Sequence, residues 1–185
     1  MNAFELPKSL PVGGKDMPIR SDFRAILDIL IAHNDPELDS EEAAAVMLTI
    51  LYPDYAEIPM EHRVEALEQA CSFIDCGRTS DGRRRPRLVD WEQDARLIIP
   101  AVNNVAHREI REMEYLHWWT FLGWFMEIGD STFSTVLRLR SKKAAGEKLD
   151  KAEEKYYREN KSMVDIKQPM HPEETAEMEN IMKWL

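Results

Sequence analysis

The sequence predicts a mostly α-helical protein: a compact helical bundle around a central aromatic-rich helix, with a small N-terminal β-hairpin or extended arm. Two observations carry this prediction. Residues 113–129 (MEYLHWWTFLGWFMEIG) hold three of the five tryptophans and place apolar side chains on every side of a helical projection. A helix that is apolar all round is either buried in a protein or lies in a membrane. The chain also has only seven glycines in 185 residues, which argues against an all-β protein dense in tight turns.

The aromatic run does not suit a membrane span. It is shorter than the ~20 apolar residues that a span needs, and Glu114, His117 and Glu127 interrupt it. We therefore expect residues 113–129 to form a central helix that other helices pack around. Gly129 should end it, because glycine accepts the left-handed geometry at a helix C-terminus.

Length, charge and cysteine content bound the class of protein. A chain of 185 residues fits one domain, and 44% hydrophobic residues supply a core. A formal net charge of −10 disfavours general nucleic-acid binding, which needs clustered Lys and Arg. Cys71 and Cys76 would project in different directions from one helix, so we expect no disulfide, as suits a reducing cytoplasm. The first residues, MNAFELPKSLPVGG, do not resemble a signal peptide.

Residues 1–20 are expected to form an N-terminal arm or hairpin. Gly13 and Gly14 stand between two short extended segments, and such a pair supplies the positive φ angles of a tight hairpin turn. Pro11 and Pro18 restrict any strand to an edge. The GGK triplet is not a phosphate-binding loop, because the upstream glycine of that motif is missing.

The helical domain spans residues 21–165 and begins with three helices. In each, apolar residues recur at helical spacing, and residues that can cap a helix precede the first two. The first follows Ser21 or Asp22 and faces inward with Phe23, Ile26, Leu27, Leu30 and Ile31; the second follows a capping box of Asp39 and Glu42 and faces inward with Met47, Leu48 and Leu51. The third runs from near Pro59 to Gly77 and faces inward with Val64, Leu67, Cys71 and Ile74.

A basic loop, residues 77–88, follows these helices. The segment GRTSDGRRRPR holds five arginines and one acid, and its Gly, Ser and Pro residues favour a loop. It is either a solvated linker or a docking loop for an acidic partner or nucleic acid. The docking candidates are Arg83, Arg84, Arg85 and Arg87.

The rest of the domain is expected to alternate helices and breaks. Asp90 with Gln93 indicates a capping box before a helix that Pro100 kinks or ends. An irregular stretch at residues 101–109 then leads into the central helix. Beyond it, Asp130 or Ser131 caps a shorter helix carrying Phe133, Val136 and Leu137, and a charged helix runs from about Asp150 to Met163.

Residues 166–185 are expected to form a C-terminal amphipathic helix. Pro172 suits the first position of such a helix. Methionine-rich stripes are adaptable surfaces, so this helix either docks back on its own domain or is a detachable hook for another protein. Its apolar stripe consists of Met178, Ile181, Met182 and Leu185, with Trp184 beside it.

The sequence carries no recognisable catalytic or metal-binding motif. It lacks a GxSxG nucleophile elbow, an HExxH zinc motif, a CxxC pair and a Walker loop, and its five histidines show no metal-ligand spacing. His117 stands among aromatic residues, and we interpret it as a buried histidine satisfied by a hydrogen bond rather than as a ligand or catalyst. We expect no enzymatic activity and no cofactor.

Several segments, in order, resemble one bacteriophage family. They are LPKSLPVGGKDMPIRSDFR (6–24), LYP (51–53), ALEQACSFIDCG (66–77), VDWEQDARLIIPAV (89–102), EYLHWWTFLGWF (114–125) and KLDKAEEKYY (148–157). The Gly-Gly hairpin with SDFR and the LHWW motif are the most specific parts, and Pro100 with Asn103-Asn104 departs from the family pattern. The family is the one named after gene product fifteen, found in tailed phages and prophages of Gram-positive bacteria.

The resemblance implies a non-enzymatic assembly factor. Genes of this family lie in the tail module near the tape-measure gene, where long-tailed phages encode tail assembly chaperones. The implied partners are the tape-measure protein and the tail-tube protein, in the host bacterial cytoplasm, with a homo-oligomer also open. A chaperone would be absent from the mature virion. The alternatives are a structural tail or head–tail component retained in the virion, and a nucleic-acid-associated factor acting through the basic loop.

The partner surface is expected to combine the C-terminal stripe with any aromatic residue of the central helix that the core leaves exposed. An acidic helical domain can present an apolar groove to an amphipathic helix, with the surrounding charge giving solubility. The competing interpretation is that all these residues belong to the core. The candidates are Trp118, Trp124, Met178, Ile181, Met182, Trp184 and Leu185.

Overall fold

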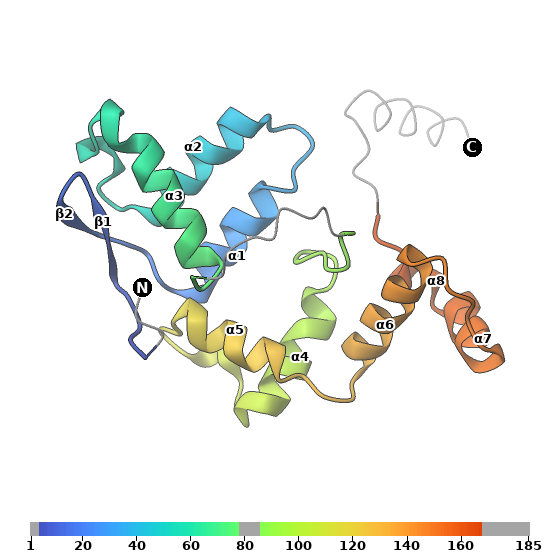
Figure 1. Cartoon of the computed structure of the whole chain (residues 1–185). Helices are drawn as coiled ribbons and strands as arrows, with labels where there is room; N and C mark the ends of the chain where they lie inside the picture. The colour runs from blue at the N-terminus through green and yellow to red at the C-terminus, as the bar shows by residue number, and fades with distance from the viewer. Residues whose placement is uncertain (1–3, 78–85, 168–185) are drawn as a thin grey trace, which may run out of the picture.

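The computed structural model in Figure 1 describes residues 4–77 and 86–167, and the predicted mostly helical architecture is confirmed. The hairpin and α1–α5 gather into one body, and α6–α8 extend from it on the side of α4. In chain order the elements are β1 (Ser9–Val12), β2 (Lys15–Pro18), α1 (Phe23–Ala32), α2 (Ser40–Leu51), α3 (Arg63–Ile74), α4 (Ala95–Ala106), α5 (Trp118–Met126), α6 (Thr132–Ala144), α7 (Lys151–Glu159) and α8 (Lys161–Val164), with 3₁₀ turns η1 (Tyr55–Glu57), η2 (Met60–His62) and η3 (Ile110–Glu112).

The N-terminal hairpin has the predicted turn. β1 and β2 pair antiparallel with Val12 opposite Lys15, and Gly13 and Gly14 adopt φ angles of +57° and +74°. A Cβ on Gly13 would lie 2.8 Å from the His62 ring, so a side chain there would clash with that ring as well as strain the backbone. Leu10 is buried, and β1 packs against α3. The hairpin is therefore part of the body rather than a free arm.

The first two helices begin where their caps predict. Asp22 caps α1 by accepting from the Arg24 backbone N–H at 3.0 Å. Asp39 and Glu42 form a complete capping box at the start of α2. These caps are local hydrogen bonds, which is why the sequence alone locates them.

The inward face predicted for α3 is half right, because Leu67 and Ile74 pack against the core but Val64 and Cys71 do not. Val64 is 68% exposed and Cys71 is exposed, although Ile74 is buried as expected. The buried face instead carries Ala66, Ala70 and Phe73. Ala66 and Ala70 let α3 approach α2 and β1 closely, and Phe73 and Ile74 are buried at its C-terminal end, while Val64 faces outward. The helix begins at Arg63 rather than near Pro59, because η2 occupies the preceding residues.

The observed course of helix α4 differs from the predicted one at its start, at Pro100 and at its end. It begins at Ala95, continues through Pro100 and ends at Ala106, so Pro100 does not end it and residues 101–106 are not irregular. Asp90 accepts from the Gln93 backbone N–H at 2.8 Å, but Gln93 does not complete a capping box. The Gln93 side chain bonds elsewhere, to the backbone beyond α8.

The central helix is shorter than residues 113–129. Its helical part, α5, begins at Trp118 because the buried His117 caps it through its Nδ1, and it ends at Met126, before Gly129. Trp118 and Phe121 are buried, and α5 packs between α1 and α4 as a central helix should. The Phe121 ring stacks on Phe23 with centroids 4.7 Å apart.

Helices α6–α8 form a second, smaller layer. Ser131, one of the two predicted caps, begins α6, and Ser134 completes a capping box with it. The helix extends to Ala144, farther than the sequence pattern indicated. The predicted charged helix is divided into α7 and α8. Val136, Leu139 and Val164 form a small buried apolar cluster within this layer, and Phe133 at the start of α6 is buried in the core of the body.

Candidate partner-binding site

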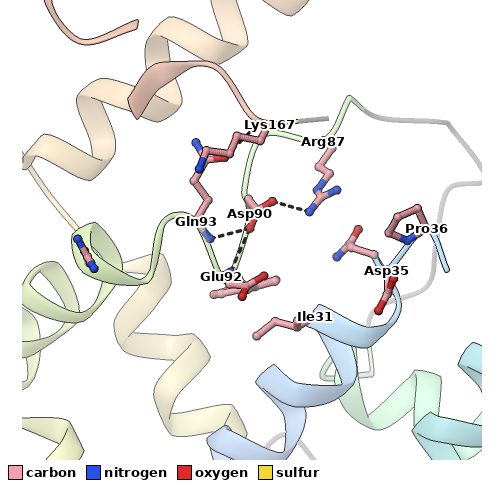
Figure 2. A pocket seen from close by; sticks show the side chains of 11 residues that line it. Ile31, Asp35, Pro36, Arg87, Asp90, Glu92, Gln93 and Lys167 are labelled. Atoms are coloured by element: carbon pink, nitrogen blue, oxygen red, sulfur yellow. Dashed lines mark hydrogen bonds and ion pairs between the residues drawn. The ribbon is translucent and has the colours of Figure 1, made fainter. Parts of the chain in front are cut away.

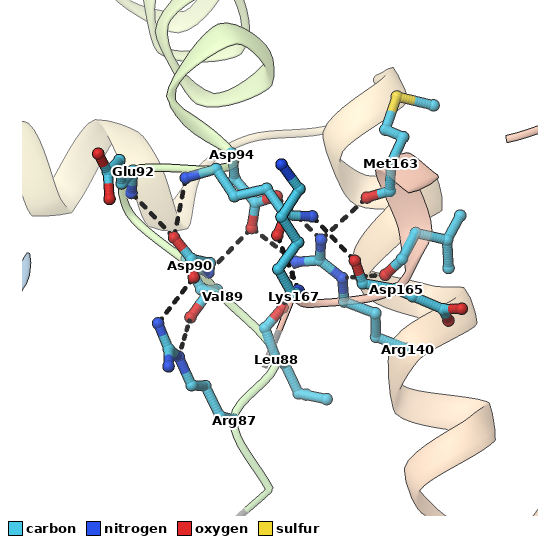
Figure 3. Close-up of polar contacts among 12 residues, drawn as sticks. Arg87, Leu88, Val89, Asp90, Glu92, Asp94, Arg140, Met163, Asp165 and Lys167 are labelled. Atoms are coloured by element: carbon cyan, nitrogen blue, oxygen red, sulfur yellow. Dashed lines mark hydrogen bonds and ion pairs between the residues drawn. The ribbon is translucent and has the colours of Figure 1, made fainter. Parts of the chain in front are cut away.

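A buried ion pair joins the α6–α8 layer to the body. Asp94, directly before α4, and Arg140 of α6 are 1% and 5% exposed. The Arg140 guanidinium donates to both Asp94 carboxylate oxygens, at 2.6 and 2.9 Å. It also donates to the backbone carbonyls of Leu88, Met163 and Val164, at 2.8, 3.0 and 2.6 Å (Figure 3). Since a guanidinium has five N–H donors, Arg140 is fully satisfied.

This ion pair fixes three separate segments at one point. Leu88 belongs to the chain entering from the basic loop, Asp94 to the start of α4, and Val164 to the end of α8. Arg140 lies one helical turn after Val136 on the same face of α6, so a position that the apolar spacing assigns to the core carries a charge. A charged residue at a core-facing position indicates a buried ion pair, but this was not predicted from the sequence.

A groove of about 760 Å³ opens beside this junction. Figure 2 shows Ile31, Asp35 and Pro36 at the end of α1 facing the turn at Asp90 and Glu92 across it. Its lining combines apolar surface with charges of both signs: Ile31, Asn34, Asp35, Pro36, Arg87, Asp90, Trp91, Glu92, Gln93, Arg96 and Lys167.

The wall of the groove is held by directional contacts. Arg87 forms an ion pair with Asp90 at 2.8 Å on the rim. The Gln93 side chain donates to the Asp165 carbonyl at 2.9 Å and accepts from the Lys167 backbone N–H at 3.0 Å. The turn at residues 90–93 is therefore tied to the chain that leaves α8. A groove of this mixed lining can hold a peptide segment with apolar and charged side chains.

The structure separates the predicted partner-binding residues. Trp118 is 2% exposed and its indole N–H donates to the Ile74 carbonyl at 2.9 Å, which makes it a core residue. Trp124 is half-buried on α5. Met178, Ile181, Met182, Trp184 and Leu185, like Arg83, Arg84 and Arg85, lie outside the described residues.

His117 is a structural residue, as we interpreted it. Its Nδ1 accepts from the Trp119 backbone N–H at 3.0 Å, so Nε2 carries the proton and donates to the Pro7 carbonyl at 2.9 Å. Burial lowers the pKa of His117, which favours this neutral form. The ring thus joins the N-terminal arm to α5.

The part of the chain that the structure describes contains neither a candidate metal site nor a candidate membrane-spanning helix. In residues 4–77 and 86–167, no group of three or more His, Cys, Asp or Glu side chains is placed to hold a metal ion. No helix in the same part of the chain is long and apolar enough to cross a membrane. Cys71 is exposed and Cys76 is half-buried, and the two thiols do not form a disulfide with each other.

Comparison with known proteins identifies the family. The family profile described as "Bacteriophage Gp15 protein" matches residues 4–166. The chain belongs to this family. The match spans the body, the buried ion pair and the α6–α8 layer, so the Gp15 family includes both halves of the fold. Comparison with curated proteins and with solved structures returned no match. Membership of the Gp15 family indicates a bacteriophage protein with a structural or assembly-related role.

Proposed function

We propose that this protein is a non-enzymatic tail assembly chaperone that binds the tape-measure protein, the tail-tube subunits or both during tail morphogenesis. The observation that carries the proposal is the Gp15 family match across residues 4–166, together with the place of such genes in the phage tail module. The protein would act in the cytoplasm of the host bacterium and be absent from the mature virion.

Charge and shape support this role. A chaperone has to bind apolar segments while keeping the complex in solution, and a net charge of −10 opposes self-association. The groove beside Ile31 and Trp91 offers apolar surface between charged rims. The Asp94–Arg140 pair holds the chain at one end of this groove, so that wall of the groove is in place before a partner binds.

The test is co-expression with the tape-measure protein of the same phage or prophage. Three forms are compared: the full chain, a chain lacking residues 169–185, and an Ile31→Lys variant of the groove. Met126→Lys, a substitution of another half-exposed apolar residue, is the matched control. We expect the full chain and the control to keep the tape measure soluble and to co-purify with it.

The variants then locate the binding surface. Loss of rescue on truncation assigns binding to the C-terminal residues, and loss in Ile31→Lys assigns it to the groove. If the full chain itself does not rescue the tape measure, the chaperone proposal is overturned.

Mass spectrometry of purified virions separates a chaperone from a structural component. We expect the protein to be missing or present only in trace amounts. A stoichiometric amount in the virion would instead assign it to the tail or to the head–tail junction.

A further inference from the structure

Helix α3 and the 3₁₀ turn η2 directly before it carry an apolar stripe that is largely exposed. Met60 is 76% and Val64 is 68% exposed, Cys71 is also exposed, and Leu67 is half-buried. These four residues are called the outer stripe. Met60 lies in η2, directly before α3, and Val64, Leu67 and Cys71 follow one face of the helix. At about 1.5 Å per residue, the part of the stripe on α3 extends over roughly 10 Å.

The apolar residues of the outer stripe are neighbours on the surface, unlike isolated exposed apolar side chains. Single exposed apolar side chains are normal, whereas a contiguous apolar strip marks an interaction site. The spacing of Val64, Leu67 and Cys71 is that of a core-facing helix. The core side of α3 is already occupied by Ala66, Ala70 and Phe73. Leu67 packs against the edge of the core, whereas the apolar side chains of Met60 and Val64 are left mostly exposed by the described fold.

A row of carboxylates lies directly beside the outer stripe. Glu61, Glu68 and Asp75 are exposed and follow one another at intervals of seven residues, which keeps them on one side of the helix. None of the three forms an ion pair with any residue in 4–77 or 86–167. Burial and, after it, the Asp75 carboxylate raise the pKa of the Cys71 thiol, consistent with a negative charge next to the stripe.

We propose that the outer stripe of α3 is a docking site for a basic amphipathic helix of another protein. Such a helix would place its apolar face on Met60 and Val64 and its Lys or Arg side chains against Glu61, Glu68 and Asp75. Helix-on-helix docking of this kind takes affinity from apolar contact and orientation from charge complementarity. The inference rests on the proposed function only in that the partner is a protein. It adds that the partner is recognised by an apolar helix face flanked by basic side chains.

Charge disfavours two other occupants. A second copy of this chain would bring the same carboxylate row and a net charge of −10. Residues 168–185 contain four glutamates and one lysine, so that segment would also set acid against acid.

The test uses the full chain and two synthetic peptides of about 18 residues, long enough to form a helix on binding. Both carry leucines at helical spacing. In one the neighbouring positions are lysine, and in the other they are glutamate. Affinity is measured by fluorescence anisotropy, and a second readout follows alkylation of Cys71 by peptide mapping, because a docked helix covers that thiol.

We expect the lysine peptide to bind at least about tenfold more tightly than the glutamate peptide and to slow alkylation of Cys71. A Met60→Gln/Val64→Gln variant should lose at least about tenfold in affinity, while Met126→Gln on α5 should bind like the wild type. Both stripe side chains are mostly exposed, so the double variant is expected to fold, as circular dichroism would verify. The inference is overturned if the stripe variant binds as tightly as the wild type, or if the two peptides bind equally.

Two further outcomes would replace the proposed occupant. Tighter lysine-peptide binding by a chain lacking residues 169–185 would identify that segment as the occupant. A dimer in sedimentation that Met60→Gln/Val64→Gln abolishes would identify a second copy. The inference and the proposed function fail separately, since the peptides report on the stripe without the tape measure, and tape-measure rescue by the full chain does not depend on the peptides.

Discussion

Different kinds of contact stabilise the body and the α6–α8 layer. In the body, aromatic rings interlock around α5: Trp118 lies against Trp91 and Phe121, with centroids 6.3 and 5.7 Å apart. In the α6–α8 layer the cluster of buried apolar residues is small. The contacts that connect this layer to the body include the Phe133 ring, whose centroid lies 5.5 Å from that of the Phe125 ring, and the buried Asp94–Arg140 ion pair.

Because the contacts differ, substitutions in the two regions should reduce stability in different ways. Apolar packing is non-directional and distributed over many contacts, so its loss weakens the whole body. A buried ion pair is directional, and removing one partner leaves an uncompensated charge at one place. We therefore expect global effects from the aromatic core and local effects from the ion pair.

The largest effect is expected from Trp118→Ala. It removes a fully buried indole and leaves the Ile74 carbonyl without its donor. We expect the free energy of unfolding to fall by about 4 kcal/mol, measured by urea denaturation. Trp124→Ala, on the same helix but half-buried, is the matched control and should cost about 1.5 kcal/mol. Equal losses in the two variants would contradict a core centred on Trp118.

Arg140→Met should come next, with a loss of about 3 kcal/mol, because it leaves Asp94 buried and unpaired. The effect should be local: hydrogen exchange should accelerate in α6–α8 and at residues 86–94, while α1, α3 and α5 keep their protection. Arg138→Met is the matched control on the same helix. Its side chain is 61% exposed, so we expect a change within about 0.5 kcal/mol. Uniform acceleration across the chain would show that the two regions unfold as one unit.

A smaller effect is expected when both partners are replaced. In Asp94→Leu/Arg140→Met no buried charge remains, so most of the stability lost in Arg140→Met should return, leaving a deficit of about 1 kcal/mol. The remaining cost comes from the carbonyls of Leu88, Met163 and Val164, which lose their donor. Denaturation of the double and single variants side by side measures the coupling. If the double variant is no more stable than Arg140→Met, the buried charge is not the cause of the loss.

The smallest effect concerns a single ring in the body. Burial lowers the folded-state pKa of His117, so below the unfolded value of about 6.5 the unfolded chain binds more protons than the folded one. This contribution to stability is complete above about pH 6.5 and declines as the pH falls toward the lower folded-state pKa. His117→Asn keeps an N-cap acceptor and should lose this slope between about pH 7 and 5.5. The exposed His33→Asn should retain it, and an unchanged slope in His117→Asn would contradict the assignment.

The sequence was reliable wherever a contact is local. The turn at Gly13 and Gly14 and the caps at Asp22, Asp39 and Ser131 each depend on atoms a few residues apart. The capping box predicted at Asp90 is the exception. The Gln93 side chain forms hydrogen bonds with the backbone of Asp165 and Lys167, beyond α8, and so does not complete the box.

The residues alone therefore predict most of the described helices, the hairpin, the aromatic core and the family, whereas the helix predicted at residues 166–185 lies almost wholly outside the described residues. Packing against the other elements sets which face of α3 is buried, since Ala66 and Ala70 allow a close approach and Val64 is left exposed. It also decided that Arg140 is a buried partner of Asp94, 46 residues away along the chain. Local hydrogen bonds are encoded within a few positions, whereas the choice of a packing face or of a distant charge partner depends on how all the helices fill space together.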